Sequence, residues 1–220
     1  METRATVRVL IVDDEPLIRS GFRFTLAADP SIEVIGEASD GAAAIELVRQ
    51  HRPDVVLMDV RMPGIGGIDA TTAIVAQTDA AVLAITSIDA DQQLIRMLAA
   101  GASGYMLKDE PPGRIIDAVH RTARGDAILS SRSAARLIHH AVAGDAGLHR
   151  QNAADLIGTL TQREREVAAG VARGETNQEI GSALHISAGT VKSHLEQVFI
   201  KLRARNRVQV GVTFAQAGLL

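Results

Sequence analysis

Five short apolar runs alternate with five helix-period stretches over residues 1–125. The runs are rich in β-branched residues, and the stretches between them repeat apolar positions every three or four residues. Strands that alternate with helices in this way form a parallel sheet covered by helices on both faces. Right-handed crossovers leave few topologies, and we expect the α/β doubly wound, five-stranded order 2-1-3-4-5. The expected strands are Val7–Val12, Ile32–Ala38, Asp54–Met58, Ala81–Thr86 and Gly104–Leu107, with helices at 16–28, 41–51, 68–78, 90–101 and 112–125.

Polar side chains stand at the expected ends of four of these strands. Asp13 and Asp14 follow the first strand, and Asp59 follows the third, directly before an irregular loop. Thr86 ends the fourth strand, and Lys108 follows the fifth. In this topology the first and third strands are neighbours at the switch point, where ligands bind beyond the strand ends. We therefore expect all five side chains to line one crevice.

That crevice would hold the groups needed for phosphoryl transfer to a carboxylate. Three carboxylates packed together repel one another unless a cation lies between them. Mg²⁺ suits such a site, because it takes one or two carboxylates together with waters and phosphate oxygens. A carboxylate nucleophile at Asp59, a hydroxyl at Thr86 and an ammonium at Lys108 complete the set. The alternative, that acids at strand ends are merely solvated, explains one such residue better than five together.

The segments "LIVDDEPLIRSGF", "DVVLMDVRMPGIGG", "AVLAIT" and "GASGYMLKD" resemble the receiver domain of bacterial two-component response regulators. The resemblance runs over about residues 7–125. It implies a flavodoxin-like receiver domain in residues 1–125. It also implies that Asp59 accepts a phosphoryl group from the phosphohistidine of a sensor histidine kinase.

The same resemblance implies roles for the other polar residues of the crevice. Asp13, Asp14 and Asp59 would hold Mg²⁺ with the backbone carbonyl of Arg61. Thr86 and Lys108 would bind phosphoryl oxygens. Tyr105 matches the aromatic switch residue of the family, which turns inward when the threonine moves; the alternative for Tyr105 is an ordinary half-buried strand tyrosine.

Composition and charge indicate a second domain of a different kind. The chain has no cysteine, which excludes disulfides and thiolate zinc sites. Its one Tyr, four Phe and no Trp argue against the aromatic stacking that binds single-stranded nucleic acid. Residues 1–125 carry 12 basic and 18 acidic side chains (net −6), whereas residues 126–220 carry 11 and 8 (net +3). The basic half is thus a candidate for binding a polyanion.

Residues 161–218 indicate four short helices. "TQRE" and "TNQE" each fit a capping box, and Ser187 is suited to cap the helix that follows. Two short helices joined tightly, the second longer and polar on one side, predict a helix-turn-helix. Residues 126–157 are expected to hold a helix at Ser130–Val142 and a linker in "AGDAGLHRQNAADLIG".

The segment "LTQREREVAAGVARGETNQEIGSALHISAGTVKSHLEQVFIKLRARNRVQ" resembles the LuxR/NarL-type DNA-binding domain, over about residues 158–220. The resemblance assigns "SAGTVKSHLEQVFIKL" to the recognition helix and 207–217 to a final helix that is often a dimer contact. Three residues depart from the usual pattern: Gly181, Glu196 and Ile200. The expected DNA-binding residues are Thr190, Lys192, Ser193, Gln197, Lys201, Arg203, Arg205 and Arg207, the arginines as a phosphate-binding cluster.

Both halves together predict a phosphorylation-controlled DNA-binding transcription factor of the NarL type. Its expected partners are a sensor histidine kinase, double-stranded DNA and, after phosphorylation, a second copy of the chain. The N-terminal apolar run is too short for a signal peptide or a membrane span, so a cytoplasmic location is expected. We expect no enzymatic activity beyond slow self-dephosphorylation.

Two rival functions are compatible with parts of the sequence. An enzyme that hydrolyses phosphoesters through an aspartyl-phosphate would want a second acid just after the nucleophile, and Asp59-Val60-Arg61 offers none. A DNA binder independent of phosphorylation would not need the five polar residues at the strand ends.

Overall fold

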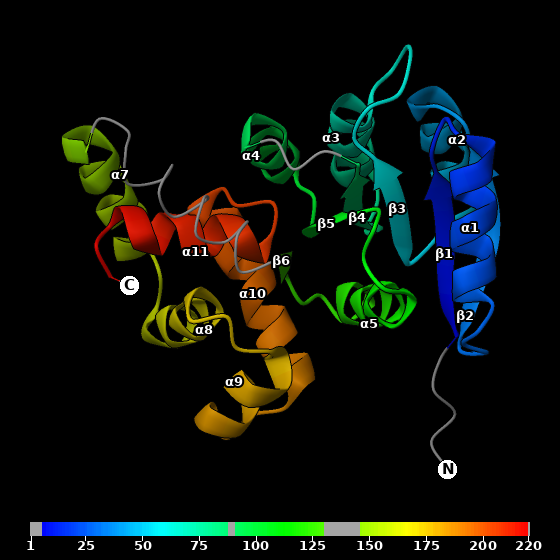
Figure 1. Cartoon of the computed structure of the whole chain (residues 1–220). Helices are drawn as coiled ribbons and strands as arrows, with labels where there is room; N and C mark the ends of the chain where they lie inside the picture. The colour runs from blue at the N-terminus through cyan, green and yellow to red at the C-terminus, as the bar shows by residue number, and fades with distance from the viewer. Residues whose placement is uncertain (1–5, 88–90, 130–145, 220) are drawn as a thin grey trace. The chain divides into compact units, whose positions relative to one another are not determined.

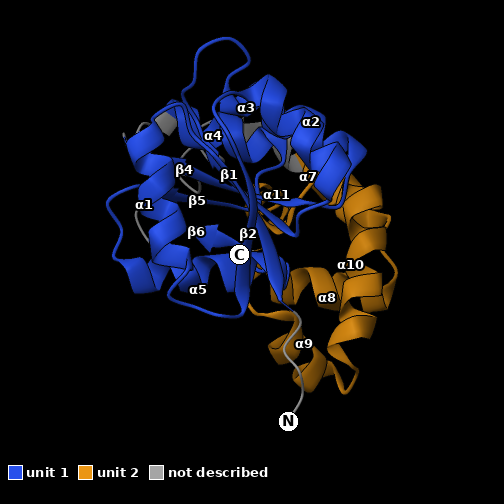
Figure 2. Ribbon diagram, turned by 90° about the vertical axis from the view of Figure 1, so that its right-hand side faces the viewer, with its two compact units in different colours: residues 1–130 blue, residues 131–220 orange. Residues whose placement is uncertain are grey.

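The computed structural model describes residues 6–87, 91–129 and 146–219. The chain divides into two compact units, residues 1–130 and 131–220, which are coloured separately in Figure 2. Each unit has its own hydrophobic core. We describe them in turn.

The first unit is built on a six-stranded, wholly parallel sheet with the order β2-β1-β3-β4-β5-β6 (Figure 1). The doubly wound order expected from the sequence is confirmed for its first five strands. The sixth strand was not predicted, because two residues are too few to show an alternating pattern. The strands are β1 Val7–Val12, β2 Ile32–Ala38, β3 Val55–Asp59, β4 Ala81–Thr86, β5 Gly104–Leu107 and β6 Ile128–Leu129.

Helices cover both faces of this sheet. The first and fifth lie on one face, where Phe22 and Leu26 pack with Ile115 and Val119 against the strands. The second, third and fourth lie on the other face (Figure 2). All five agree with the sequence to within two residues at each end. Their bounds are α1 Pro16–Leu26, α2 Gly41–His51, α3 Gly67–Gln77, α4 Asp91–Ala100 and α5 Pro112–Ala123.

The second unit consists of five helices within the described residues: α7 Ala146–Gly158, α8 Gln162–Ala172, α9 Asn177–Leu184, α10 Ala188–Leu202 and α11 Arg207–Gln216. Both predicted capping boxes form, at Thr161 and Thr176. Ser187 accepts a hydrogen bond from the Thr190 amide and so caps α10. The four helices expected between 161 and 218 are therefore confirmed. None of the described helices has the length and apolar character to cross a membrane.

The linker predicted over "AGDAGLHRQNAADLIG" is wrong for 146–158, which form α7. Its small and polar residues carry a weak helical pattern, but Ala153 and Ile157 are buried, with Ile157 packed in the core of the second unit. Tertiary packing therefore stabilises a helix that propensity alone did not indicate. The helix predicted at Ser130–Val142 lies outside the described residues.

The loop between β3 and α3 turns back tightly beneath Asp59. Gly67, the first residue of α3, lies so close to the strand end that a Cβ atom there would be 1.9 Å from the Asp59 carbonyl oxygen. At Gly66, by contrast, the nearest atoms to a Cβ would be 3.9 Å away, and φ is −71°. Glycine at 67 is thus what allows α3 to begin directly against the end of β3.

We expect Gly67→Ala to lower the free energy of unfolding of the first unit by roughly 3 kcal/mol, because backbone atoms must move to admit the methyl group. Gly66→Ala is the matched control and should cost no more than about 1 kcal/mol, because the weaker N-cap is partly offset by a less flexible unfolded chain. Urea unfolding of both variants measures the difference. Equal losses in the two variants would contradict the packing argument.

Candidate functional site

The polar strand ends predicted from the sequence meet at one edge of the sheet. Parallel pairing places Val12 of β1 beside Met58 of β3, and Thr86 of β4 beside Leu107 of β5. The residues that follow Val12, Met58 and Leu107 in the chain are therefore brought to the same edge. Between them lies the centre of the candidate site.

Three carboxylates gather there. Oxygen atoms of Asp13, Asp14 and Asp59 all lie within 4.8 Å of one another. Asp13 and Asp59 are buried, whereas Asp14 is exposed to solvent. A cluster of hard oxygen donors with one open side fits Mg²⁺, which keeps several waters in its coordination shell. The three predicted carboxylate ligands are thus brought together, and the backbone N–H of Arg61 also donates to the Asp59 carboxylate.

Lys108 supplies positive charge to this cluster. Its Nζ lies 2.6 Å from Asp13 Oδ2 and 3.4 Å from Asp59 Oδ2, and its side chain is 8% exposed. Burial by itself would lower the pKa of Lys108, but the hydrogen bond to Asp13 and the charge of Asp59 hold it above its usual value. Lys108 is therefore a cation throughout the physiological pH range. One ammonium faces three carboxylates, and negative charge is left in excess.

That excess is visible in the ionisation of Asp59. Burial raises the pKa of this carboxyl from 3.8 to about 6, against the opposing attraction of Lys108. The neighbouring charge of Asp13 contributes to this raised pKa, whereas the Arg61 amide stabilises the ionised form. Asp59 is consequently a buried carboxylate whose charge is incompletely balanced by the protein. A bound cation would stabilise the ionised form of Asp59.

Thr86 and Tyr105 lie beside the acid cluster in the sheet. Both are buried, each only 1% exposed. Tyr105 pairs with Ala84 in the register of β4 and β5, so Tyr105, Ala84 and Thr86 share one face of the sheet. The half-buried alternative for Tyr105 does not fit its burial. Its role as a switch stays a prediction.

Arg19 is a supporting residue that the sequence did not reveal. Its guanidinium donates to the Asp13 backbone carbonyl at 2.7 Å and forms an ion pair with Glu37 at 3.3 Å. The Glu15 amide donates to Asp13 Oδ1 at 3.0 Å. These contacts fix the end of β1, and hence the position of Asp13. They depend on how α1 and β2 pack beside β1, for which the sequence carries no local signal.

The second candidate site is the exposed side of α10. Val191, Leu195, Val198 and Leu202 face the core, as the sequence predicted. Thr190, Lys192, Ser193 and Gln197 are exposed on the other side. Thr190 also bonds to the cap residue, Oγ1 to Ser187 Oγ at 2.9 Å. The middle of α10 therefore presents a polar surface that a DNA groove can accept.

Two of the expected DNA-binding residues are instead bonded within the second unit. Lys201 Nζ lies 2.9 and 2.6 Å from the two carboxylate oxygens of Glu164, which is 6% exposed. Arg207 is 8% exposed and donates to the Asn177 side chain and the Glu175 carbonyl. These bonds hold elements of the second unit together, so DNA contact is proposed below for the other six residues. Arg203 and Arg205 are exposed.

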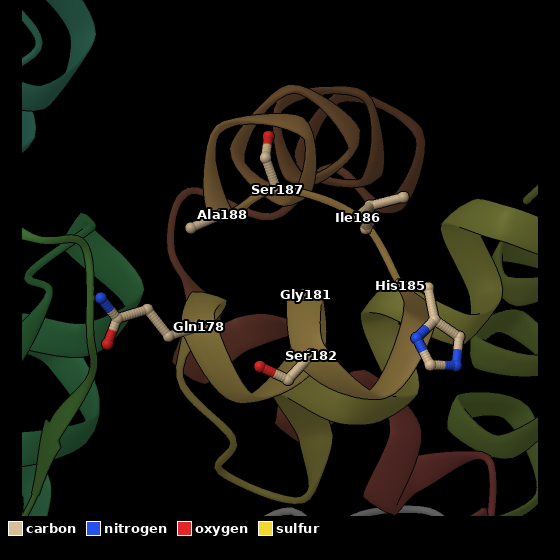
Figure 3. A pocket seen from close by; sticks show the side chains of 7 residues that line it. All are labelled: Gln178, Gly181, Ser182, His185, Ile186, Ser187 and Ala188. Atoms are coloured by element: carbon tan, nitrogen blue, oxygen red, sulfur yellow. The ribbon is translucent and has the colours of Figure 1, made fainter.

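The turn between α9 and α10 contains an open hollow of about 620 Å³. Figure 3 shows Gln178 and Ser182 from α9 on one side of it and Ser187 and Ala188 on the other. Gly181 lies at its base, where a Cβ atom would be 2.7 Å from the Ile186 carbonyl oxygen. The departure from the family pattern at Gly181 thus accompanies a close approach of α9 to the turn that precedes α10.

Comparisons with known proteins assign a family to each unit. Residues 9–120 match the family described as "Response regulator receiver domain", and residues 158–214 match "Bacterial regulatory proteins, luxR family". The transcriptional regulatory protein YxjL of Bacillus subtilis is 37% identical over 97% of each chain. The nitrate/nitrite response regulator NarP of Escherichia coli is 37% identical over 95% of this chain and 94% of its own.

Among solved structures, the receiver domain of the response regulator NarL from Mycobacterium tuberculosis is 41% identical, with a TM-score of 0.53 over 55% of this chain and 98% of its own. The chain belongs to the response regulators that join a receiver domain to a LuxR-family DNA-binding domain. It is a phosphorylation-controlled, DNA-binding transcriptional regulator.

The raised pKa of Asp59 predicts how stability depends on pH without Mg²⁺. A carboxyl whose pKa is higher in the folded than in the unfolded state stabilises the fold below about pH 4, and that contribution is lost as the pH rises through about 6. Asp59→Asn should therefore raise the free energy of unfolding at pH 7.5 by about 1–3 kcal/mol and leave it nearly unchanged at pH 4.

Urea unfolding in EDTA at the two pH values measures this difference. Glu33→Gln, which removes an exposed acid of β2, is the control and should show no such pH-dependent gain. Mg²⁺ should stabilise the wild type more than Asp59→Asn. An Asp59→Asn variant that is less stable than the wild type at pH 7.5 would contradict the excess of negative charge.

Proposed function

We propose that Asp59 is the residue that accepts the phosphoryl group, and that the donor is the phosphohistidine of a sensor histidine kinase. The observation that carries this proposal is the burial of Asp59 between two further carboxylates and the ammonium of Lys108. Its carboxylate is the nucleophile, and Lys108 lies close enough to stabilise charge on the incoming phosphoryl oxygens.

Asp13, Asp14 and Asp59, with the backbone carbonyl of Arg61, would hold Mg²⁺. Bound there, the ion would neutralise charge on the phosphoryl oxygens and the carboxylates together. Asp13 is positioned by Arg19 and the Glu15 amide, and Asp14 faces solvent. The exposed side of the cluster thus leaves a path by which the donor reaches Asp59.

Phosphorylation would act through a shift between two conformations. Thr86 and Lys108 would bind the phosphoryl oxygens, and Tyr105, on the same face of the sheet as Thr86, would follow the movement of the threonine. A coupling of about 1–3 kcal/mol is typical of such switches. The active conformation would favour a dimer of the chain and its binding to DNA.

The proposed division of the chain is a receiver domain in residues 1–125 and a DNA-binding domain in 158–220, with α7 of the intervening 126–157 packed into the core of the second unit. The kinase phosphohistidine and DNA are both cytoplasmic, so we place the protein there. We also propose that the receiver is no independent enzyme and only loses its own phosphoryl group slowly. Asp59-Val60-Arg61 places no second acid after the nucleophile to support turnover.

The proposed DNA-binding residues are Thr190, Lys192, Ser193 and Gln197 on the exposed side of α10, with Arg203 and Arg205 beyond its end. The residues near the N-terminal end of a recognition helix contact base edges, and basic residues outside the groove contact phosphates. Lys192 would thus read bases, whereas the two arginines would fix the register on the duplex.

Acetyl phosphate with Mg²⁺ should add one phosphoryl group to the wild type and none to Asp59→Asn, because Asp59 ends β3 facing both the Asp13–Asp14 pair and Lys108. Asp14→Ala should also prevent labelling, through loss of a metal ligand. Intact-protein mass spectrometry measures the added group. Labelling of Asp59→Asn to the wild-type extent would disprove the assignment.

Arg203→Gln and Lys192→Ala should weaken DNA binding in different ways. Loss of a phosphate contact at Arg203 should lower affinity for specific and random duplexes alike and flatten the salt dependence by about one unit. Lys192→Ala should lower discrimination between the duplexes by about 1–3 kcal/mol. Fluorescence titrations across salt concentrations separate the two effects. A uniform loss in Lys192→Ala would contradict base reading.

Arg207→Ala should instead destabilise the second unit by about 2–3 kcal/mol, because it removes the hydrogen bonds of a buried guanidinium to Asn177 and to the Glu175 carbonyl. Thermal unfolding measures the loss. A stable Arg207→Ala variant whose salt dependence is flattened would return Arg207 to the DNA-binding set.

A further inference from the structure

The exposed side of α10 carries an acid where a polyanion is expected to bind. Glu196 is exposed, and it lies four residues after Lys192 and four before Ile200, so the three share one side of the helix. Ile200 is 70% exposed. Opposite them lie the buried residues that hold α10 in the core. Glu196 is therefore in the middle of the surface proposed to enter the DNA groove.

The structure gives Glu196 no partner that would neutralise it. Within the described part of the chain, no lysine, arginine or histidine forms an ion pair with this carboxylate, and it accepts no side-chain hydrogen bond. Lys192 is near enough in sequence to pair along the helix, but a lysine that precedes a glutamate by four residues is the weaker arrangement. By contrast, Glu164, Glu166 and Glu175 of this unit form ion pairs with basic residues. Asp155 and Glu179 accept hydrogen bonds from neighbouring polar side chains.

An unpaired carboxylate that faces DNA lowers the affinity of the protein for most DNA sequences. It is repelled by phosphates, and base edges that present only acceptors cannot bond to it. In the major groove, guanine presents N7 and O6 and thymine presents O4, all acceptors. Cytosine presents the N4 amino group as a donor, and adenine presents N6 beside the acceptor N7. Cytosine is therefore the base that a carboxylate fits best.

We propose that Glu196 determines operator specificity by accepting a hydrogen bond from the N4 amino group of a cytosine in each half-site. The inference rests on the proposed DNA-binding role of α10 and adds one base preference to it. The same carboxylate disfavours the other bases at that position and lowers binding to unrelated DNA. Glu196 thus contributes both an attractive and a repulsive element to recognition.

The test is selection of binding sites from a random duplex library by the full-length chain, with acetyl phosphate and Mg²⁺. The wild type should enrich a motif with cytosine at one position of each half-site, and another base there should lower affinity about tenfold. Glu196→Ala should lose that preference to within about twofold, keep the other positions, and bind random duplex more tightly than the wild type does.

Glu196→Gln provides a sharper outcome. A glutamine can donate and accept together, and it pairs with adenine N6 and N7. The preferred base at this one position should therefore change from cytosine to adenine. Asp155→Asn is the control for net charge, because Asp155 is an exposed acid of α7. The asparagine side chain keeps an oxygen that can accept the hydrogen bond from Gln151. Its motif should equal that of the wild type.

Motifs that are identical in the wild type, Glu196→Ala and Glu196→Gln would overturn the inference while leaving DNA binding intact. A change in Asp155→Asn equal to that in Glu196→Ala would also overturn it, since net charge alone would then be responsible. If the wild type enriches no sequence at all, the proposed function fails and the inference fails with it. Circular dichroism of each variant confirms that the helices are unchanged.

Discussion

Incompletely balanced charge at one edge of the parallel sheet is the constraint on which the function of the first unit depends. Three carboxylates meet there, and Lys108 is the ammonium that contacts two of them. A protein that only needed stability would not bury Asp59 at a pKa of about 6. The excess charge makes the edge of the sheet receptive to a cation. It therefore prepares Asp59 for reaction at some expense to the stability of the fold.

The second unit uses its charges in the opposite way. Lys201 forms an ion pair with Glu164, and Arg207 donates hydrogen bonds to Asn177 and to the Glu175 carbonyl, so both residues hold α10 and α11 to neighbouring parts of the unit. Lys192, Glu196 and Arg203 remain exposed. The basic character of residues 126–220 therefore overstates the charge offered to DNA. What α10 presents is a small mixed surface, better suited to selecting a sequence than to holding any duplex.

The sequence predicted the strand order and the residues of the acid cluster because each apolar run stops at a polar residue, and parallel strands bring those ends together. It could not predict which basic residues are bonded internally. Lys201 and Glu164 are 37 positions apart in the sequence, and only tertiary packing brings their side chains together. It also missed α7, whose weak pattern is stabilised by contacts in the core, and β6, which has two residues. Short-range sequence patterns thus predicted the residues of the acid cluster better than the tertiary contacts around them.

The most direct test of this account is the affinity of the full-length chain for its selected operator duplex, measured with and without acetyl phosphate at constant Mg²⁺ and salt. The degree of phosphorylation at Asp59 is determined in the same samples. Coupling between the two units predicts that phosphorylation tightens binding by about 5- to 150-fold. Unchanged affinity in samples whose Asp59 is fully phosphorylated would contradict control of DNA binding by the receiver domain.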